Sequence, residues 1–270
     1  MYEFNYHRPV SLEEAQRLFH GSDDATYLAG GHTLIPTMKN RLAAPSDLID
    51  LRNIPDLKGI SCVEGRLIIG AAETHFDVSS SAIVLKAIPA LAALAGSIGD
   101  VQVRYCGTIG GSLANNDPAA DYPSAVLGLG AEIYTNKRSI PADEFFDGLY
   151  ATALEDGEII LRISFPIPDT AGYAKVRNPA SRYPIAATFV SRTDRLYRVA
   201  VTGAGNNGVF RWSEAENVLN RGEGSAGLIG LQPDEDLMLD DLHAGQDYRA
   251  HLVGVLTRRA VDAPGQLTLC

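Results

Sequence analysis

The sequence predicts an α+β fold, in which two small α/β units precede a C-terminal domain built on an antiparallel sheet. Strand and helix patterns alternate up to about residue 165. The proline-punctuated segment Phe165–Pro168 then marks a boundary. Beyond it, three strand patterns follow one another and two helix patterns come last. We therefore expect one domain over residues 1–168, with subdomains of about 1–54 and 55–168, and a second domain over residues 169–270.

The first unit begins with a helix that carries its own start signal. Ser11 can cap this helix, and Glu14 can complete a capping box. Leu12, Ala15, Leu18 and Phe19 then share one apolar face. The remaining elements follow in order: a turn at Gly21–Asp24, a strand at Ala25–Leu28, the pair Gly30-Gly31, a helix over Thr33–Leu42 and a strand at Leu48–Leu51.

The second unit and the C-terminal domain follow from the same patterns. The second unit is expected to contain a strand Arg66–Ala71, a helix Ser80–Ile98 interrupted at Pro89, a glycine-rich loop Gly107–Asn116, a helix Asp121–Leu129, and strands Ala131–Tyr134 and Glu158–Ile163. The C-terminal domain is expected to contain strands Gly172–Arg177, Ala187–Arg192 and Leu196–Thr202, and helices Glu214–Leu219 and Tyr248–Asp262.

Composition excludes several classes of function. With 23 basic and 33 acidic residues the net charge is -10, which disfavours binding to nucleic acid. The most apolar stretch, Ala82–Gly96, is broken by Lys86 and Pro89, so no transmembrane segment is expected. No apolar leader opens the chain, and a cytoplasmic location is the simplest expectation.

Metal and nucleophile chemistry are also poorly supported. The three cysteines, Cys62, Cys106 and Cys270, form no C-x-x-C pair, and the six histidines are scattered. A disulfide framework, a zinc site and an iron–sulfur cluster are therefore not expected on this chain, and Cys106 is expected to be buried and inert. Because no nucleophile–base pair is evident, we name no catalytic side chain.

The first candidate site is the loop between the strand Ala25–Leu28 and the helix after it. Glycines at positions 30 and 31 allow backbone N–H groups to approach an anion closely, and Thr33 can cap the helix start. A diphosphate suits this arrangement. The alternative is a tight turn that needs a positive φ and binds nothing.

The second candidate site is the loop Gly107–Asp121. It gathers Thr108, Ser112, Asn115 and Asp121 around Gly110-Gly111. Hydroxyl and amide groups can donate to phosphate oxygens, and a carboxylate suits ribose hydroxyls. The alternative is structural, with Asp117-Pro118 as a turn and Asp121 as a helix cap. Neither loop has the spacing of a Rossmann fingerprint or a P-loop.

Further segments complete a recognisable series. They are Ala29–Pro36, Gln102–Arg104 with Gly107–Ser112, Asp117–Asp121, Lys175–Arg177 with Ser181–Tyr183, Val201–Ala204 and His251–Ala260. This series resembles the FAD-binding medium subunits of the molybdenum hydroxylase family, such as those of carbon monoxide dehydrogenase and xanthine dehydrogenase. The resemblance covers essentially the whole chain.

The resemblance implies a PCMH-type FAD-binding domain of two α/β subdomains, followed by a CO-dehydrogenase-flavoprotein C-terminal domain. It assigns to the FAD diphosphate region Ala29, Gly30, Gly31, His32, Thr33 and Leu34, together with Thr108, Ile109, Gly110, Gly111 and Ser112. It assigns Asp121 to the ribose side, with Asn115 beside it. Whether His32 contributes its ring or only its backbone is left open.

Two residues of the C-terminal domain are implied to lie near the flavin. Tyr183 would cover one face of the isoalloxazine, and the charge of Lys175 would favour reduced, anionic flavin. Taken without the resemblance, Tyr183 is a half-buried strand aromatic and Lys175 is a solvated strand residue.

The implied function is that of an FAD-containing electron-transfer subunit of an oxidoreductase. A molybdopterin-binding large subunit and a [2Fe-2S] small subunit would be its partners, in a dimer of heterotrimers, with a quinone or NAD as electron acceptor. Two other classes remain open. One is a self-contained FAD-dependent oxidoreductase acting directly on a small molecule, and the other is a non-enzymatic nucleotide-binding module.

Overall fold

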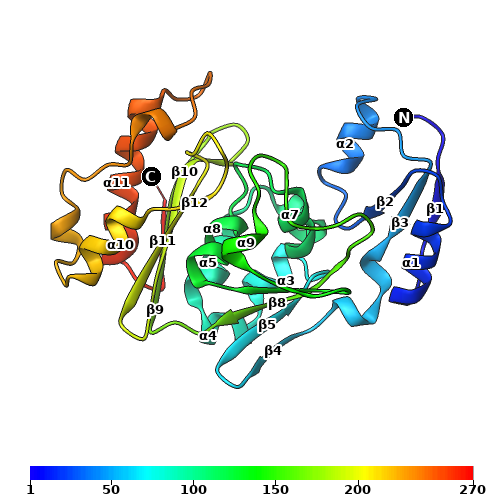
Figure 1. Cartoon of the computed structure of the whole chain (residues 1–270), viewed down its shortest axis with the longest axis horizontal. Coiled ribbons are helices and arrows are strands. Elements are labelled where there is room, and N and C mark those ends of the chain that lie inside the picture. Colours follow the sequence, from blue (N-terminus) through cyan, green and yellow to red (C-terminus); the bar gives the residue numbers. More distant parts are fainter. Residues whose placement is uncertain (270) are drawn as a thin grey trace.

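The computed structural model describes residues 1–269, so Cys270 lies outside it. The chain forms three consecutive parts, each built on its own sheet (Figure 1). The N-terminal part, drawn in blue, and the C-terminal part, drawn in yellow to red, lie at opposite ends of the molecule. The middle part lies between them. The expected α+β class, with an antiparallel C-terminal sheet, is confirmed.

The N-terminal part has a parallel sheet in the order β1-β3-β2. Its elements are β1 (Asn5–His7), α1 (Leu12–His20), β2 (Ala25–Leu28), α2 (Leu34–Lys39) and β3 (Asp47–Asp50). Ser11 caps α1 as expected by accepting from the backbone N–H of Glu14, but the Glu14 carboxylate accepts from Val10 rather than from Ser11. Helix α2 is shorter than predicted because Arg41, with a φ of 60°, turns the chain out of the helix.

The middle part has an antiparallel sheet in the order β4-β5-β8-β6-β7. The strands are β4 (Ile60–Val63), β5 (Arg66–Gly70), β6 (Glu132–Thr135), β7 (Ser139–Pro141) and β8 (Ile160–Pro166). The strands of this second unit therefore pair antiparallel, whereas those of the first unit pair parallel. The missed feature is a hairpin, because Glu64 and Gly65 both adopt positive φ angles and join β4 to β5 in a two-residue turn.

The helices of the middle part are short and nearly continuous. They are α3 (His75–Ser80), α4 (Ala82–Ala87), α5 (Pro89–Ser97), α6 (Val101–Cys106), α7 (Ile109–Asn115), α8 (Tyr122–Leu129) and α9 (Ala142–Phe145), with 3-10 turns at Leu51–Asn53 and Pro55–Leu57. Pro89 starts α5 because a helix tolerates proline in its first turn. The predicted loop Gly107–Asn116 is mostly the helix α7, so the loop prediction was wrong there.

The C-terminal part has a sheet in the order β12-β11-β10-β9-β13, antiparallel except for β13 beside β9. Its strands are β9 (Thr170–Arg177), β10 (Pro184–Thr193), β11 (Leu196–Thr202), β12 (Phe210–Arg211) and β13 (Leu267–Leu269). Its helices are α10 (Ser213–Asn220) and α11 (Gln246–Asp262), with 3-10 turns at Ser225–Leu228 and Glu235–Leu237.

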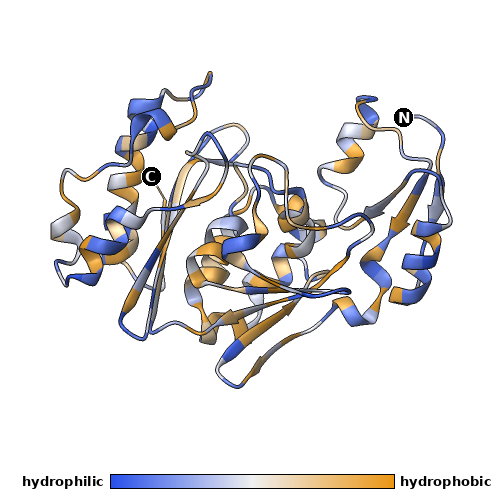
Figure 2. Cartoon of the chain, viewed as in Figure 1, coloured by the Kyte–Doolittle hydropathy of each residue, from blue (hydrophilic) through white to orange (hydrophobic). Residues whose placement is uncertain are grey.

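The main core joins the middle and C-terminal parts. Helices α5 and α8 lie between their two sheets, and α10 and α11 cover the outer face of the C-terminal sheet (Figure 1). Every residue of α8 is buried, and one cluster unites Leu91, Tyr122, Ile163 and Phe189. Apolar residues accordingly line the inward faces of these elements in Figure 2. Among residues 1–269, no helix has the length and apolar character needed to cross a bilayer.

Candidate functional site

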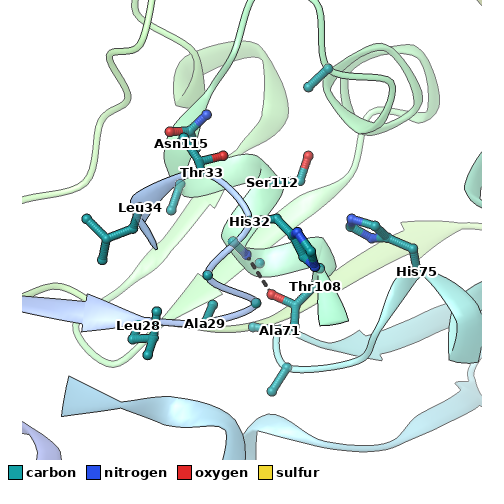
Figure 3. Close-up of a pocket in the computed structure, with 18 of the residues that line it drawn as sticks. Leu28, Ala29, His32, Thr33, Leu34, Ala71, His75, Thr108, Ser112 and Asn115 are labelled. Carbon is teal, nitrogen blue, oxygen red and sulfur yellow. Dashed lines mark hydrogen bonds between the residues drawn. The ribbon is translucent and has the colours of Figure 1, made fainter. Parts of the chain in front are cut away.

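A cavity of about 500 Å³ opens where the three parts of the chain meet. It is lined by residues 26–34 from the N-terminal part, by Ala71, His75 and ten of the residues between Gly107 and Asp121 from the middle part, and by Arg182 and Tyr183 from the C-terminal part. This volume falls in the range of cofactor and ligand sites. Figure 3 shows the side chains that converge on it.

The two glycine-containing segments touch each other at the wall of this cavity. A Cβ atom on Gly30 would lie 2.5 Å from the carbonyl oxygen of Cys106 and 2.5 Å from the Cα of Gly107. A Cβ on Gly111 would lie 3.1 Å from the Cβ of Ala29. Only glycine permits such an approach between two backbones. The structure therefore brings both predicted segments into one site.

Most of the residues singled out from the sequence line the cavity. They are Ala29, Gly30, Gly31, His32, Thr33, Leu34, Thr108, Gly110, Gly111, Ser112, Asn115, Asp121 and Tyr183. Ile109 and Lys175, which were also singled out, do not line the cavity. The Ile109 side chain is fully buried in the main core, and Lys175 lies behind Asp121 in the C-terminal sheet.

The two segments differ in what their main chains offer a ligand. Within the described residues, the backbone N–H groups of residues 30–33 donate to no protein acceptor. In the second segment, the N–H groups of Ile109 and Gly110 donate to the carbonyls of Glu73 and Ala71, and that of Gly111 donates to the Thr108 hydroxyl. Among the described residues, Thr108 has the one N–H group of residues 107–112 that donates to no protein acceptor, so the second segment offers fewer free main-chain amides than the first.

Side chains supply the polar groups of the second segment instead. Ser112 and Asn115, on the cavity side of α7, share the space with Thr33 and His32 from the first loop (Figure 3). Among the hydrogen bonds of residues 1–269, none engages the side chains of Thr33, Ser112 or Asn115. Thr33 therefore does not cap α2 with its hydroxyl. The cavity thus combines four main-chain donors with three uncommitted polar side chains.

Two buried groups donate to one carboxylate oxygen of Asp121. Its Oδ1 accepts from the Lys175 Nζ at 2.7 Å and from the Tyr173 hydroxyl at 2.5 Å. Lys175 is fully buried and Asp121 is 5% exposed, so the ion pair is shielded from water. Burial, followed by the nearby Asp121 carboxylate, raises the pKa of Tyr173 well above its ordinary value, so this hydroxyl remains a donor.

The other oxygen of Asp121 is uncommitted. Within residues 1–269 no group donates to Oδ2, and Asp121 does not cap α8 with its side chain. Since Asp121 lines the cavity, one carboxylate oxygen is fixed by Lys175 and Tyr173 while the other can accept from a ligand hydroxyl. Lys175 reaches the cavity only through Asp121, so its charge is neutralised before it can act on a ligand.

The β9–β10 connection closes one end of the cavity. Its Arg182 packs against Gly99, and its Tyr183, which is 42% exposed, lies at the cavity wall. Burial, followed by the carboxylates of Asp117 and Asp121, raises the pKa of Tyr183. The tyrosine is therefore a neutral ring with a hydroxyl donor, suited to covering an aromatic ligand face.

Several cavity residues carry no sequence motif. Arg52 follows β3, where Asp50 binds it at 2.7 Å, and Ala71 and Ala72 follow β5. His75 begins α3 beside Gly107. Their shared signal is position at the end of a strand or the start of a helix, which recurs too often in a sequence to identify a site alone.

His75 leads to a prediction about acid stability. Burial, followed by the charges of His32 and Arg104, lowers the pKa of His75 from 6.5 to about 3. Between pH 6.5 and about pH 3, the unfolded chain binds a proton at this imidazole that the folded chain does not bind, so acidification favours unfolding. We expect the free energy of unfolding to fall by about 1.4 kcal/mol for each pH unit below 6.5 on account of this group.

Urea unfolding of the isolated chain, without added ligand, tests this by comparing the wild type with His75→Phe. The wild type should lose stability relative to the variant as the pH falls from about 6 to about 4.5. The carboxylates that begin to titrate near the lower end are common to both chains, so their contributions largely cancel in the comparison. The exposed His243 offers a matched control, since His243→Phe also removes an imidazole. Parallel pH profiles for the wild type and His75→Phe would contradict the prediction.

Among the described residues, neither a metal-binding cluster nor a thiol side chain lines the cavity. Residues 1–269 contain no cluster of three or more His, Cys, Asp or Glu side chains that could hold a metal ion. Cys62 and Cys106 are both free and exposed, so the expectation of a buried Cys106 was wrong. Cys106 is exposed because it ends α6 at the surface while its carbonyl, not its thiol, faces Gly30.

Comparison with known proteins agrees with the geometry. The family model described as the FAD binding domain in molybdopterin dehydrogenase matches residues 2–168. The carbon monoxide dehydrogenase medium chain of Afipia carboxidovorans is 35% identical over 283 residues, covering 96% of each chain. The nicotine 6-hydroxylase medium subunit of Paenarthrobacter nicotinovorans is 34% identical, covering 97% of this chain and 98% of the relative. A chain of reconstituted CO dehydrogenase from Oligotropha carboxidovorans superposes with a TM-score of 0.87 at 32% identity, covering 97% of this chain and 98% of that chain.

Proposed function

Because the chain belongs to the family of FAD-binding medium subunits of molybdenum hydroxylases, we propose that FAD lies in the cavity and that the chain carries electrons from an iron–sulfur partner to an external acceptor. The observation that carries the proposal is the contact between Gly30 and Gly107. It sets the free N–H groups of residues 30–33 beside the polar side chains of α7.

The residues present fit FAD in three respects. Four main-chain donors without protein acceptors suit the two negative charges of a diphosphate. The free Oδ2 of Asp121 suits the hydroxyl groups of a ribose or ribityl chain. The phenol ring of Tyr183 suits one face of an aromatic ring system.

The residues that line the cavity then bind and orient FAD, and none of them takes part in making or breaking a covalent bond. Ser112, Asn115 and Thr33 donate to the diphosphate region, and Asp121 fixes the sugar. Tyr183 shields the flavin, with Lys175 acting indirectly by holding Asp121 in place. FAD supplies exchange of one or two electrons when bound, and the protein supplies position and electrostatics.

The supporting relatives are subunits of larger enzymes. The similar proteins are named as medium chains or subunits of dehydrogenases, so the chain is one component of a multi-subunit oxidoreductase. We propose a molybdopterin-binding large subunit and a [2Fe-2S] small subunit as partners, in a cytoplasmic dimer of heterotrimers. A quinone or NAD would be the terminal electron acceptor. The chain itself would divide into an FAD-binding domain, residues 1–168, and a C-terminal domain, residues 169–270.

Reconstitution tests this proposal. The FAD-free chain is expected to bind one FAD, and the assembled complex is expected to reduce that FAD when its substrate is added, as followed by bleaching of flavin absorbance. The isolated FAD-loaded chain should not turn over the same substrate. Turnover by the isolated chain would favour a self-contained oxidoreductase, and failure to bind FAD would favour a nucleotide-binding module of another kind.

A further inference from the structure

The imidazole of His75 is held in place at the cavity wall by its surroundings. His75 is the first residue of α3, whose start is fixed by a capping box between Thr74 and Asp77. Its backbone N–H donates to the carbonyl of Gly107 at 2.9 Å. Its ring packs at a tilt against Tyr122, with 5.3 Å between ring centroids. The ring therefore has little freedom to seek other partners.

This held ring lacks hydrogen-bond partners inside the protein. The side chain is only 6% exposed, and neither ring nitrogen bonds to any of residues 1–269. Nδ1 is completely enclosed. Nε2 lies alongside Gly107, where a Cβ would be 2.6 Å away, in the same stretch of wall that touches Gly30. Buried polar groups without a partner are rare, and one at a ligand cavity points to the ligand.

The charge state and tautomer follow from these surroundings. Burial, followed by the charges of His32 and Arg104, keeps the pKa of His75 far below neutrality, so the ring carries a single N–H. A proton on the enclosed Nδ1 would have no acceptor at all. A proton on Nε2 can meet an oxygen atom of a ligand in the cavity. The ring is therefore arranged as a neutral donor facing the cavity.

We propose that the Nε2–H of His75 donates a hydrogen bond to an oxygen atom of bound FAD, next to the junction of Gly30 and Gly107, and so positions the dinucleotide. This inference rests on the proposed function. It assigns His75 a binding role that complements the main-chain donors of residues 30–33. His32, whose ring lies beside that of His75 in Figure 3, approaches the same space from the opposite segment.

Three substitutions of His75 distinguish the contributions of Nε2, of Nδ1 and of the ring as a whole, and a fourth substitution at His243 is the control. His75→Gln places an amide N–H near the position of Nε2, while His75→Asn places one near Nδ1. His75→Phe keeps a planar ring without any donor. His243→Phe removes an exposed imidazole that does not line the cavity and serves as the matched control.

The measurement is the FAD dissociation constant of the FAD-free chain, obtained by titration of flavin fluorescence at pH 7. Loss of the hydrogen bond should weaken binding about tenfold in His75→Phe and His75→Asn, while His75→Gln should stay within about threefold of the wild type. Thermal unfolding checks that each variant is folded. Rescue of binding by His75→Gln but not by His75→Asn is a result that a purely structural role of the ring would not produce.

The outcomes are distinct. If the wild type binds FAD and all three His75 variants bind it equally well, or if His75→Gln is as weak as His75→Asn, the role of His75 is overturned while the proposed function stands. If the wild type itself binds no FAD, the proposed function fails. If His75→Phe does not fold, the comparison of His75→Gln with His75→Asn still decides which nitrogen matters.

Discussion

Replacing Gly30 with alanine is expected to reduce FAD retention to near zero. The added Cβ would lie 2.5 Å from both the Cys106 carbonyl oxygen and the Gly107 Cα. These are backbone atoms, so no side-chain rotation can relieve the overlap, and the two segments must separate. The free N–H groups of residues 30–33 would then move away from α7 and its polar side chains. The measurement is flavin absorbance per chain after reconstitution and gel filtration.

Gly96→Ala is the matched control. A Cβ at Gly96 in α5 would meet only the Ser79 Cβ at an ordinary 3.7 Å, so FAD content should equal that of the wild type. Circular dichroism should show that both variants keep their secondary structure. Full flavin occupancy in Gly30→Ala would contradict the proposed site. Gly111 is a weaker test, because an alanine there meets the Thr108 hydroxyl and the Ala29 Cβ at 3.0–3.1 Å, and these side chains can yield.

Replacing Lys175 with methionine is expected to lower the free energy of unfolding by roughly 3–5 kcal/mol. The Asp121 carboxylate would remain buried without its cation, keeping only the Tyr173 hydroxyl on Oδ1. The long apolar side chain of methionine keeps most of the lysine's packing, so the loss reports charge rather than volume. The measurement is urea unfolding of the FAD-free chain at neutral pH.

Two comparisons sharpen this result. The double variant Lys175→Met with Asp121→Asn removes both charges and should recover much of the lost stability. Lys137→Met breaks an exposed ion pair with Glu155, 3.1 Å long, and should cost about 1 kcal/mol or less. If Lys175→Met is no more destabilising than Lys137→Met, the buried pair does not support this part of the fold.

The sequence alone was sufficient to predict the order of the parts and the two segments that form the site. Ser11 as a cap, Pro89 as the start of α5 and the three successive strands of the C-terminal sheet follow from local propensities that tertiary contacts did not override. The glycines at 30 and 110 could be identified because a close approach to a neighbouring backbone demands glycine whatever the partner is.

Only the tertiary structure decided which groups remain free to bind. The N–H groups of Ile109 and Gly110 are satisfied by carbonyls of Glu73 and Ala71, residues far away in the sequence, so they could not be distinguished in advance from those of residues 30–33. Lys175 pairs with Asp121 across 54 positions of the chain, and packing encloses the Nδ1 atom of His75 without a partner. Whether a hydrogen-bond donor finds an acceptor within the protein depends on which residues pack against it. Contacts between residues far apart in the chain leave no local pattern in the sequence.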